Sequence, residues 1–592
     1  MTQNGSWGKW LGMGAAGLVA GVLGIGYVGA VWFLWRAGLE TNSARPWTLW
    51  TYYQAYPDDP HTMKLLQEGL MAGAAAVVAA LVAMFMPGKK KVWGDARWAR
   101  AGEIAKAGLF GKRGIIFGRV GARTLCLEGQ EFVGVRAPTR SGKGVSVVIP
   151  NLLNFDDSAV VLDIKHENFE LTSGFRAACG QACYLFDPVA ESGYGHRWNP
   201  LAYIAEGPRR INDIQKIAGL IFQEPPGENP MWTSEARDIF LGVVLYLLDT
   251  PELPVTMGEV LRQFKTEKPT GDHFAEIVQA HGDRLDPVCV MALSNFAGKA
   301  PKEQSGVKSS VTSALSLWMN PMIDAATSGN DFDLRDLRRK RMTIYVGVTP
   351  DNLERMAPIV NLFFQQVVDL NTRVLPEHDE TLKHQVLLLM DEFPAVGYLG
   401  VIAKGVAFLA GYNLRLLPIY QSEAQLRDTY GADPAKNIVD NMAVRVVFPP
   451  RDKDDAKDLS EELGDTTVKQ VSRTHSKGST SRNISQTKRA FMLPQELRLL
   501  GRDKAIVLAR DCRPIKATKI VWFKEEAFTT RRRPAMSLPE IAPVTNEIRG
   551  RAEPEVDLDF DAIPFPDEER AMTDEEVEAA AEAFWNMLPA QA

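Results

Sequence analysis

The sequence predicts an α/β protein with a parallel β-sheet, an inserted all-α domain and an N-terminal membrane anchor of two helices. Three observations lead to this prediction. Two long uncharged runs lie within the first 91 residues. From residue 92 onward, short aliphatic or β-branched runs alternate with longer amphipathic stretches, which is the pattern of parallel strands joined by helices. Between about residues 210 and 321 this alternation stops, and the pattern is helical throughout.

Length and composition exclude several classes of protein. The chain has 592 residues, of which 24% are charged and 45% are apolar. This is ordinary globular composition, and it argues against a small disulfide scaffold, a collagen, a disordered chain or a transporter with many spans. The five cysteines form no CxxC pair, so we expect a reducing compartment and no structural zinc.

The two uncharged runs are expected to span a bilayer. Residues 11–35 lie between Lys9 and Arg36, and the second span covers about residues 65–86. At about 1.5 Å per residue each run can cross a hydrocarbon core of roughly 30 Å. A cleaved signal peptide is the alternative for the first run, but the run lacks a short apolar core with a small-residue cleavage site. Three lysines at 89–91 place the large C-terminal part in the cytoplasm by the positive-inside rule.

Two features of this anchor bear on helix packing and on partners. Gly17 with Gly21 and Gly69 with Gly73 have the GxxxG spacing, which lets helix backbones approach closely in lipid. The loop between the spans, residues 36–64, contains several Trp and Tyr residues. These aromatic side chains suit the membrane interface or the docking of a membrane partner.

The cytoplasmic part divides into four segments by pattern. Residues 92–209 and 322–528 are the two parts of a nucleotide-binding domain, residues 210–321 are an all-α insertion, and residues 529–592 are a flexible acidic tail. Seven apolar runs are expected to be strands, at residues 132–136, 159–162, 183–186, 342–347, 386–390, 414–419 and 445–448. Within the insertion, residues 235–248 and 309–318 are expected to be helices.

A phosphate-binding loop follows the first of these strands. It consists of Ala137, Pro138, Thr139, Arg140, Ser141, Gly142, Lys143, Gly144 and Val145, and an apolar segment that should begin a helix comes next. Backbone amides of such a loop surround phosphate oxygens, and Lys143 supplies a positive charge for the β and γ phosphates of ATP. Ala137 replaces the usual first glycine, and Gly144 replaces the hydroxyl residue that ordinarily binds Mg²⁺. Taken alone, the loop could also be a structural turn.

Two carboxylates follow the apolar run at 386–390. A buried strand that ends in Asp391 and Glu392 presents both carboxylates at the edge of a parallel sheet. We expect Asp391 to hold Mg²⁺ through water and Glu392 to polarise the water that attacks the γ-phosphate. A solvated acidic turn is the structural alternative.

Gln421 ends the next predicted strand. A neutral amide at this position can report γ-phosphate occupancy to the following helix. For an isolated glutamine a surface position is the simpler explanation. Lys143, Asp391, Glu392 and Gln421 are therefore the predicted catalytic residues.

Two charged segments each allow two interpretations. Residues 467–489 contain six Lys or Arg residues and no acid, which predicts a flexible basic loop that either contacts DNA or is a mobile surface insertion. Residues 551–592 contain 13 acidic residues against Arg551 and Arg570. The helical pattern at 574–588 in this tail suits docking to a partner, and a solubilising tail is the alternative.

These residues resemble the type IV coupling proteins of conjugation and type IV secretion, over nearly the whole chain. Besides the two spans, the resemblance rests on residues 94–99, 138–144, 163–165, 186–188, 198–201, 232, 236–237, 391–394, 421–422, 425–426 and 492–496. Lys-Gly at 143–144 is itself common in these relatives, so the missing hydroxyl looks like a family variant. Relatives with a basic residue before the Gln-bearing strand differ from this chain, which has Leu409 and Ala410 there. The arginine finger is therefore unassigned, with Arg415, Arg427 and Arg445 as weak candidates.

The resemblance implies a RecA-like P-loop ATPase that forms a hexamer in the bacterial inner membrane. By this likeness, the protein uses ATP and Mg²⁺ to pass single-stranded DNA with its relaxase, or secreted proteins, toward a type IV secretion channel. The helical insertion is then a candidate receiver of cargo, although packing alone explains its apolar pattern. Two rival functions remain: a DNA-segregation translocase, and a docking receptor that binds nucleotide without hydrolysing it.

Overall fold

The computed structural model describes residues 7–85, 93–223, 230–476 and 479–542, together with the single residues 544 and 573. The predicted tail helix at 574–588 lies outside the described residues. The chain forms two compact units, Met1–Gly94 with Thr467–Thr487, and Asp95–Thr466 with Lys488–Ala592. We describe each unit by itself.

The first unit contains three helices, α1 (Trp7–Arg36), α2 (Thr48–Ala55) and α3 (Pro60–Phe85). Among the described residues, one helix is long and apolar enough to cross a membrane, namely Pro60–Val82. The described part of the first apolar run, Gly21–Arg36, is a shorter apolar helix. One candidate span is thus observed, and the anchor of two spans stays a prediction.

Close backbone approach between α1 and α3 occurs at two of the predicted glycines. A Cβ atom on Gly69 would lie 2.8 Å from the carbonyl oxygen of Gly29, and one on Gly73 would overlap the carbonyl group of Ile25. A side chain at either position would therefore push the helices apart. Gly21, by contrast, has no neighbour within 4 Å of such an atom. The GxxxG prediction is confirmed for Gly69 and Gly73, and Gly21 shows no such contact.

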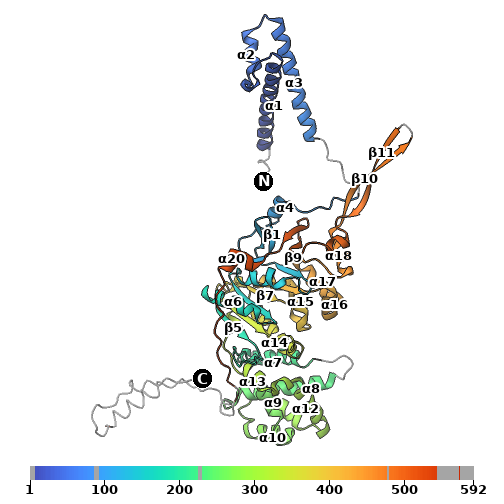
Figure 1. Cartoon of the computed structure of the whole chain (residues 1–592). Helices are drawn as coiled ribbons and strands as arrows, with labels where there is room; N and C mark the ends of the chain where they lie inside the picture. Colours follow the sequence, from blue (N-terminus) through green and yellow to red (C-terminus); the bar gives the residue numbers. More distant parts are fainter. Residues whose placement is uncertain are drawn as a thin grey trace. The chain divides into compact units, whose positions relative to one another are not determined.

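The second unit is built on an eleven-stranded sheet, in which the seven strands from β9 to the edge strand β5 are parallel. Figure 1 labels the strands of this sheet for which there is room. The parallel strands run in the order β9-β3-β8-β7-β4-β6-β5. Their bounds are β3 (Phe132–Arg136), β4 (Ser158–Asp163), β5 (Ala182–Phe186), β6 (Met342–Gly347), β7 (Val386–Met390), β8 (Leu414–Tyr420) and β9 (Met442–Val447). All seven predicted strands are confirmed, although β9 begins three residues before its predicted start.

Four further strands extend the sheet beyond β9 in antiparallel pairing. They are β12 (Lys504–Ala509), β13 (Ile515–Thr518), β1 (Ile115–Val120) and β2 (Arg123–Leu127). The sequence analysis does not predict them. In β13 buried and exposed residues alternate, as in antiparallel strands with one solvated face.

The basic segment at 467–489 is not a flexible loop. It forms most of two strands, β10 (Asp465–Ser476) and β11 (Ser479–Ala490), which pair as a separate two-stranded sheet. The segment is rich in Thr and Ser and contains several Val and Ile residues, and Thr, Val and Ile favour extended backbone. Our prediction overweighted its charge and polarity. Within the first unit, the Trp93 amide donates to Thr467 Oγ1 (3.1 Å), which joins the base of this β-ribbon to the segment before Gly94.

The two faces of the parallel sheet support different sets of helices. Leu387 and Leu389 of β7 pack in a cluster with α5 (Ile149–Leu152) and α6 (Glu167–Ala178). Leu388 and Met390 of the same strand belong to a second cluster with α14 (Leu353–Asn371) and the helical insertion. Alternate residues of one buried strand thus hold both layers, as the period of two requires.

The insertion consists of helices between β5 and β6. No strand occurs among the described residues from Arg209 to Ala326. The helices are α7 (Arg209–Ile221), α8 (Pro230–Leu248), α9 (Met257–Phe264), α10 (Thr270–His281), α11 (Pro287–Ala297), α12 (Pro301–Ala314) and α13 (Pro321–Ala326). The helix predicted at 235–248 is confirmed. That at 309–318 ends at Ala314, and a short 3₁₀ turn follows it.

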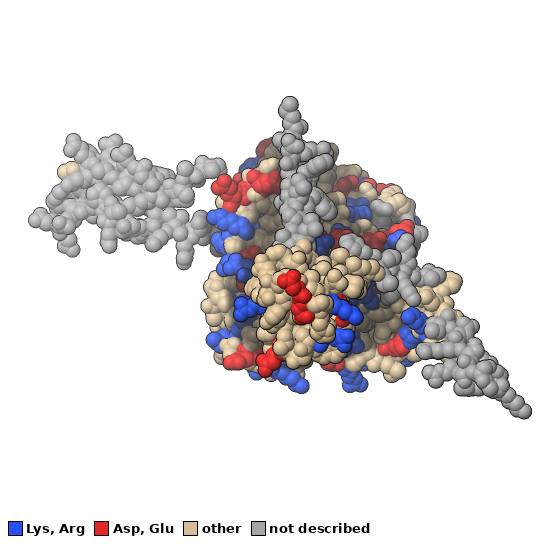
Figure 2. Space-filling model, turned by 90° about the horizontal axis from the view of Figure 1, so that it is seen from above, with Lys and Arg blue, Asp and Glu red and all other residues tan. Residues whose placement is uncertain are grey.

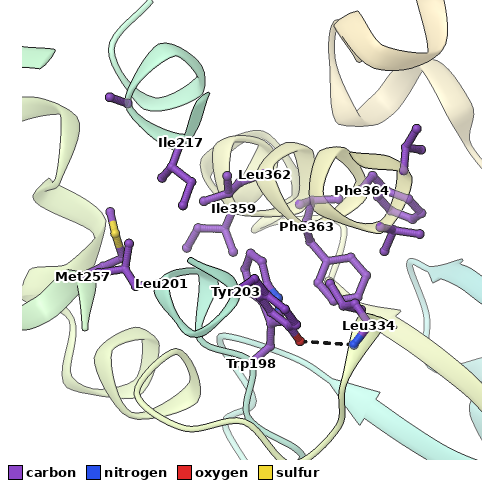
Figure 3. Close-up of a cluster of buried hydrophobic side chains, with 14 of the residues drawn as sticks. Trp198, Leu201, Tyr203, Ile217, Met257, Leu334, Ile359, Leu362, Phe363 and Phe364 are labelled. Atoms are coloured by element: carbon purple, nitrogen blue, oxygen red, sulfur yellow. Dashed lines mark hydrogen bonds between the residues drawn. The ribbon is translucent and has the colours of Figure 1, made fainter. Parts of the chain in front are cut away.

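The insertion shares one continuous core with the sheet. Figure 3 shows Trp198, Leu201 and Tyr203 beside Met257 of the insertion and Phe363 of α14. Trp198 is fully buried and packs edge-on against the ring of Phe363, with ring centroids 5.1 Å apart. The Tyr203 hydroxyl accepts a hydrogen bond from the Leu334 amide (3.3 Å). The apolar core therefore has no boundary between the sheet layer and the insertion.

Candidate active site

The predicted phosphate-binding loop leaves the carboxyl end of β3. Arg140 and Gly142 have positive φ angles of 57° and 86°, so the chain turns sharply there. Gly144–Val148 then forms a π-helical turn that continues into α5. The predicted order of strand, loop and helix is confirmed. The loop is fastened to the sheet where the Ala137 amide donates to the Tyr420 carbonyl of β8 (2.9 Å).

Lys143 lies against both predicted carboxylates. Its Nζ donates to the backbone carbonyl of Asp391 (2.6 Å), lies 3.4 Å from Asp391 Oδ1 and contacts Glu392 Oε2 directly. Lys143 and Glu392 are 249 positions apart in the chain. They meet because the carboxyl ends of β3 and β7 share one edge of the sheet.

Gln421 lies between these groups because β8 runs between β3 and β7. Its Nε2 donates to Glu392 Oε1 (2.8 Å), and its Oε1 accepts a hydrogen bond from Thr139 Oγ1 (2.9 Å). A single chain of contacts thus runs from Thr139 through Gln421 and Glu392 to Lys143. The structure brings the four predicted catalytic residues together.

Burial changes the acidity of two carboxyl groups at this edge. Burial raises the pKa of Asp391 above its usual value, and the nearby ammonium group of Lys143 opposes the rise. Asp163, at the end of β4, is 1% exposed, and burial raises its pKa to about 6. The Phe169 amide donates to Asp163 (2.8 Å), so this carboxyl group also holds the first turn of α6 in place.

The donor set fits a magnesium ion at Asp391. Asp391 Oδ1 is buried and has no hydrogen-bond partner among the described residues, although the Lys143 ammonium is near. Mg²⁺ prefers oxygen ligands, keeps several waters and is commonly held by one or two carboxylates together with substrate phosphates. Gly144 supplies no hydroxyl, so Asp391 would hold Mg²⁺ through water.

The four predicted catalytic residues line a cavity of about 670 Å³, a volume suited to a small-molecule ligand. Its lining combines the loop, the carboxyl ends of β4, β7 and β8, the first turns of α6, and an aromatic pair. The lining residues are Thr139, Arg140, Gly142, Lys143, Gly144, Val145, Ile149, Asp163, Ile164, Lys165, Glu167, Asn168, Leu171, Asp391, Glu392, Gln421, Trp522 and Phe523. Ala137, Pro138 and Ser141 of the predicted loop do not line it.

Our sequence analysis missed a segment that follows β13 and reaches the loop. Lys519 is 6% exposed, donates to the Ser141 carbonyl (3.0 Å) and lies 3.5 Å from the ring centre of Phe448. Trp522 and Phe523, three and four residues further on, line the cavity. The available signal was an unusual one, since Ile520, Val521, Trp522 and Phe523 form an apolar run directly before the polar C-terminal part.

Replacing Lys519 with methionine should weaken nucleotide binding without lowering stability at neutral pH. Burial lowers the pKa of Lys519 to about 8, so the ammonium group is charged below that pH and neutral above it. We expect wild-type ATP affinity to fall as pH rises through about 8, because a cation beside the loop is lost. Lys519→Met should show no such fall and should bind ATP about fivefold more weakly at pH 7, equivalent to about 1 kcal/mol.

The measurement is ATP affinity from pH 6.5 to 9.5, with thermal unfolding of both proteins at pH 7. Methionine removes a buried charge at similar volume, so the melting temperature should not decrease. Below pH 8 the buried lysine of the wild type is charged, and burying this charge lowers the free energy of unfolding. Between pH 8 and 10.5 Lys519 is neutral in the native protein and still protonated in the unfolded chain, so the free energy of unfolding of the wild type rises with pH. An unchanged pH profile in Lys519→Met would contradict this role.

Of the weak arginine-finger candidates, the structure excludes Arg415. Its side chain is fully buried, and it donates to the carbonyl groups of Leu127 (3.2 Å) and Glu131 (3.0 Å). It therefore holds the turn between β2 and β3. Arg427 and Arg445 are partly exposed, and the structure assigns neither of them to the cavity described above.

Comparison with known proteins agrees with this geometry. A family model described as type IV secretory system conjugative DNA transfer matches residues 97–542. Protein VirD4 of Rhizobium radiobacter is 34% identical over 475 residues, which cover 77% of this chain and 67% of that protein. Conjugal transfer protein TraG of Escherichia coli is 29% identical over 555 residues, covering 83% of this chain and 86% of the relative.

The fold is shared with a solved structure. Plasmid coupling protein TrwB, in complex with a non-hydrolysable ATP analogue, superposes with a TM-score of 0.54 at 18% identity, covering 78% of this chain and 99% of the chain in that structure. A TrwB structure with ADP and Mg²⁺ gives a TM-score of 0.52. At this identity the likeness establishes the α/β fold with its parallel sheet. The match to the family model and the identity with VirD4 show that the chain belongs to the type IV secretory system conjugative DNA transfer family.

Proposed function

We propose that this protein is a type IV coupling protein: a membrane-anchored ATPase that recruits DNA with its relaxase, or protein substrates, and couples ATP hydrolysis to their transfer into a type IV secretion channel. The observation that carries the proposal is the meeting of Lys143, Glu392 and Gln421 at one cavity, in a chain of this family. The VirD4 and TraG relatives support the role in transfer, and TrwB with its bound nucleotide analogue supports ATP as the ligand.

The chemistry follows from the contacts of Lys143 and Glu392. A triphosphate in the cavity competes with the two carboxylates for the Lys143 ammonium group. Once a phosphate takes this ammonium, Glu392 keeps the hydrogen bond from Gln421 and can accept the proton of an attacking water. Gln421 also contacts Thr139 of the loop, so it links the phosphate site to Glu392. Mg²⁺, when bound through Asp391, supplies charge neutralisation on the β and γ phosphates.

The proposed placement is the bacterial inner membrane, with spans at about residues 11–35 and 65–86 and most of the chain in the cytoplasm. The helix Pro60–Val82 supports the second span. The nucleotide-binding domain comprises residues 92–209 and 322–528, and the insertion at 210–321 receives cargo. The acidic tail, residues 529–592, favours basic partners by charge.

The proposed assembly is a homohexamer that handles single-stranded DNA without reading its sequence. Binding of this kind needs cations along the path of the phosphates. Figure 2 shows Lys and Arg interspersed with Asp and Glu on the face that it draws. The β-ribbon, with Lys469 and Lys488 among its cations, is a candidate DNA contact.

Phosphate release by the full-length chain in detergent tests the proposal. We expect ATP hydrolysis that single-stranded DNA stimulates several-fold, with a stimulation that decreases as salt rises because phosphate contacts release counterions. Stronger stimulation by double-stranded DNA would favour a segregation translocase. Oligomerisation on ATP with no phosphate release would favour the docking receptor, a rival that the missing hydroxyl at Gly144 keeps open.

A further inference from the structure

One wall of the nucleotide cavity is apolar. Val145, Ile149, Leu171, Trp522 and Phe523 line the cavity together with the charged residues. Ile149, Leu171 and Trp522 also pack in one hydrophobic cluster, so they lie on the same side. The triphosphate of a nucleotide can bind the charged residues at the carboxyl ends of the strands. The apolar wall is then available to the uncharged part of the nucleotide, its base and sugar.

The two aromatic rings of this wall differ in exposure. Trp522 is half-buried against the hydrophobic cluster, whereas Phe523 is 51% exposed. Their ring centroids lie 5.7 Å apart at an interplanar angle of 85°, so one ring supports the other edge-on. Such edge-to-face pairs are favourable because the positive edge of one ring meets the negative face of the other. Trp522 therefore stabilises Phe523 in a position that borders the cavity.

The segment that carries the rings is fixed relative to the phosphate-binding loop. At its start, Lys519 donates to the Ser141 carbonyl of the loop (3.0 Å). In its middle, Glu525 forms an ion pair with Arg119 of β1 (3.4 Å). At its end, Arg531 donates to the Leu153 carbonyl, directly after α5 (2.6 Å). The aromatic wall is thus organised before any ligand binds, which limits the entropic cost of binding.

We propose that Phe523, supported by Trp522, stacks on the base of the bound nucleotide. This inference rests on the proposed function and names a residue of the same site that contacts the base. An aromatic face stacks on any base and carries no hydrogen-bond donor or acceptor, so stacking provides affinity with little choice of base. Purines have a larger ring system than pyrimidines and gain more from it.

Binding to the full-length chain in detergent, measured by calorimetry with ATP, GTP and inorganic tripolyphosphate, tests this inference. We expect Phe523→Ala to bind ATP and GTP about tenfold more weakly, the size of a lost base–aromatic contact, and tripolyphosphate unchanged. Phe523→Trp should restore both nucleotides. The matched control is Phe408→Ala, because Phe408 is also an exposed phenylalanine (62%) in this unit and does not line the cavity. It should bind all three ligands as the wild type does.

The outcomes separate this inference from the proposed function. If the wild type binds neither ATP nor tripolyphosphate, the proposed function fails. If the wild type binds both, and Phe523→Ala either binds ATP normally or loses tripolyphosphate to the same extent, the aromatic contact with the base is wrong.

Discussion

Lys143→Ala is expected to abolish ATP hydrolysis and to weaken nucleotide binding. Lys143 is the loop cation that contacts both Asp391 and Glu392, and it is the group available to the β and γ phosphates. Loss of a charge-assisted hydrogen bond costs about 1.5–3 kcal/mol, so ATP affinity should fall about tenfold or more. Turnover should fall at least about 100-fold, because the lost interaction strengthens in the transition state. Phosphate release and ATP binding by the purified protein measure these effects.

The matched control for this change is Lys340→Ala. Lys340 is an exposed lysine that pairs with Asp336 away from the cavity, so its removal should leave turnover unchanged. Membrane insertion should be intact in both variants, since neither residue lies in an expected span. Normal turnover by Lys143→Ala would refute the assignment of the phosphate-binding loop.

Glu392→Gln is expected to separate binding from chemistry. The amide keeps the shape of the side chain and can still bond to Gln421, but it cannot accept a proton from water. Turnover should therefore fall about 10²–10⁴-fold, the usual contribution of a general base. ATP affinity should be equal to that of the wild type or higher, because Lys143 no longer has the Glu392 carboxylate as a competing partner.

Asp391→Asn gives the contrasting pattern. We place Asp391 on Mg²⁺, so its loss should reduce ATP binding in the presence of Mg²⁺, whereas binding without Mg²⁺ should change little. If Glu392→Gln hydrolyses ATP at the wild-type rate, another group is the base. If the two variants behave alike in both assays, the division of roles between the carboxylates is wrong.

The parallel strands could be predicted because burial on both faces leaves a plain sequence signal. The runs at 132–136 and 386–390 match β3 and β7 at both ends, since neither strand contains a residue that faces solvent. Strand β13 escaped prediction for the opposite reason. The exposed Lys516 interrupts its apolar pattern, and its place in the sheet depends on pairing with β1, which is remote in sequence. Strand β12, by contrast, contains an apolar run at residues 505–509 and could have been predicted.

The candidate active site could likewise be predicted only in part. Lys143, Asp391, Glu392 and Gln421 each follow an apolar strand, so their meeting at one edge of the sheet follows from the parallel topology. The order of the strands in the sheet does not follow from the sequence pattern. Gln421 can bridge Thr139 and Glu392 because β8 lies between β3 and β7. Lys519 reaches Ser141 from 378 positions away through the antiparallel edge, and no local pattern reports that contact.

The unbroken core between the sheet and the helical insertion has a mechanical consequence. Trp198, Met257 and Phe363 belong to one packed cluster, so sliding the insertion against the sheet would open voids among close-packed side chains. We therefore expect the insertion to move with the nucleotide-binding layer as a lever arm. In the proposed ATPase, a small rotation at the ATP site would then be magnified at the far ends of the insertion helices.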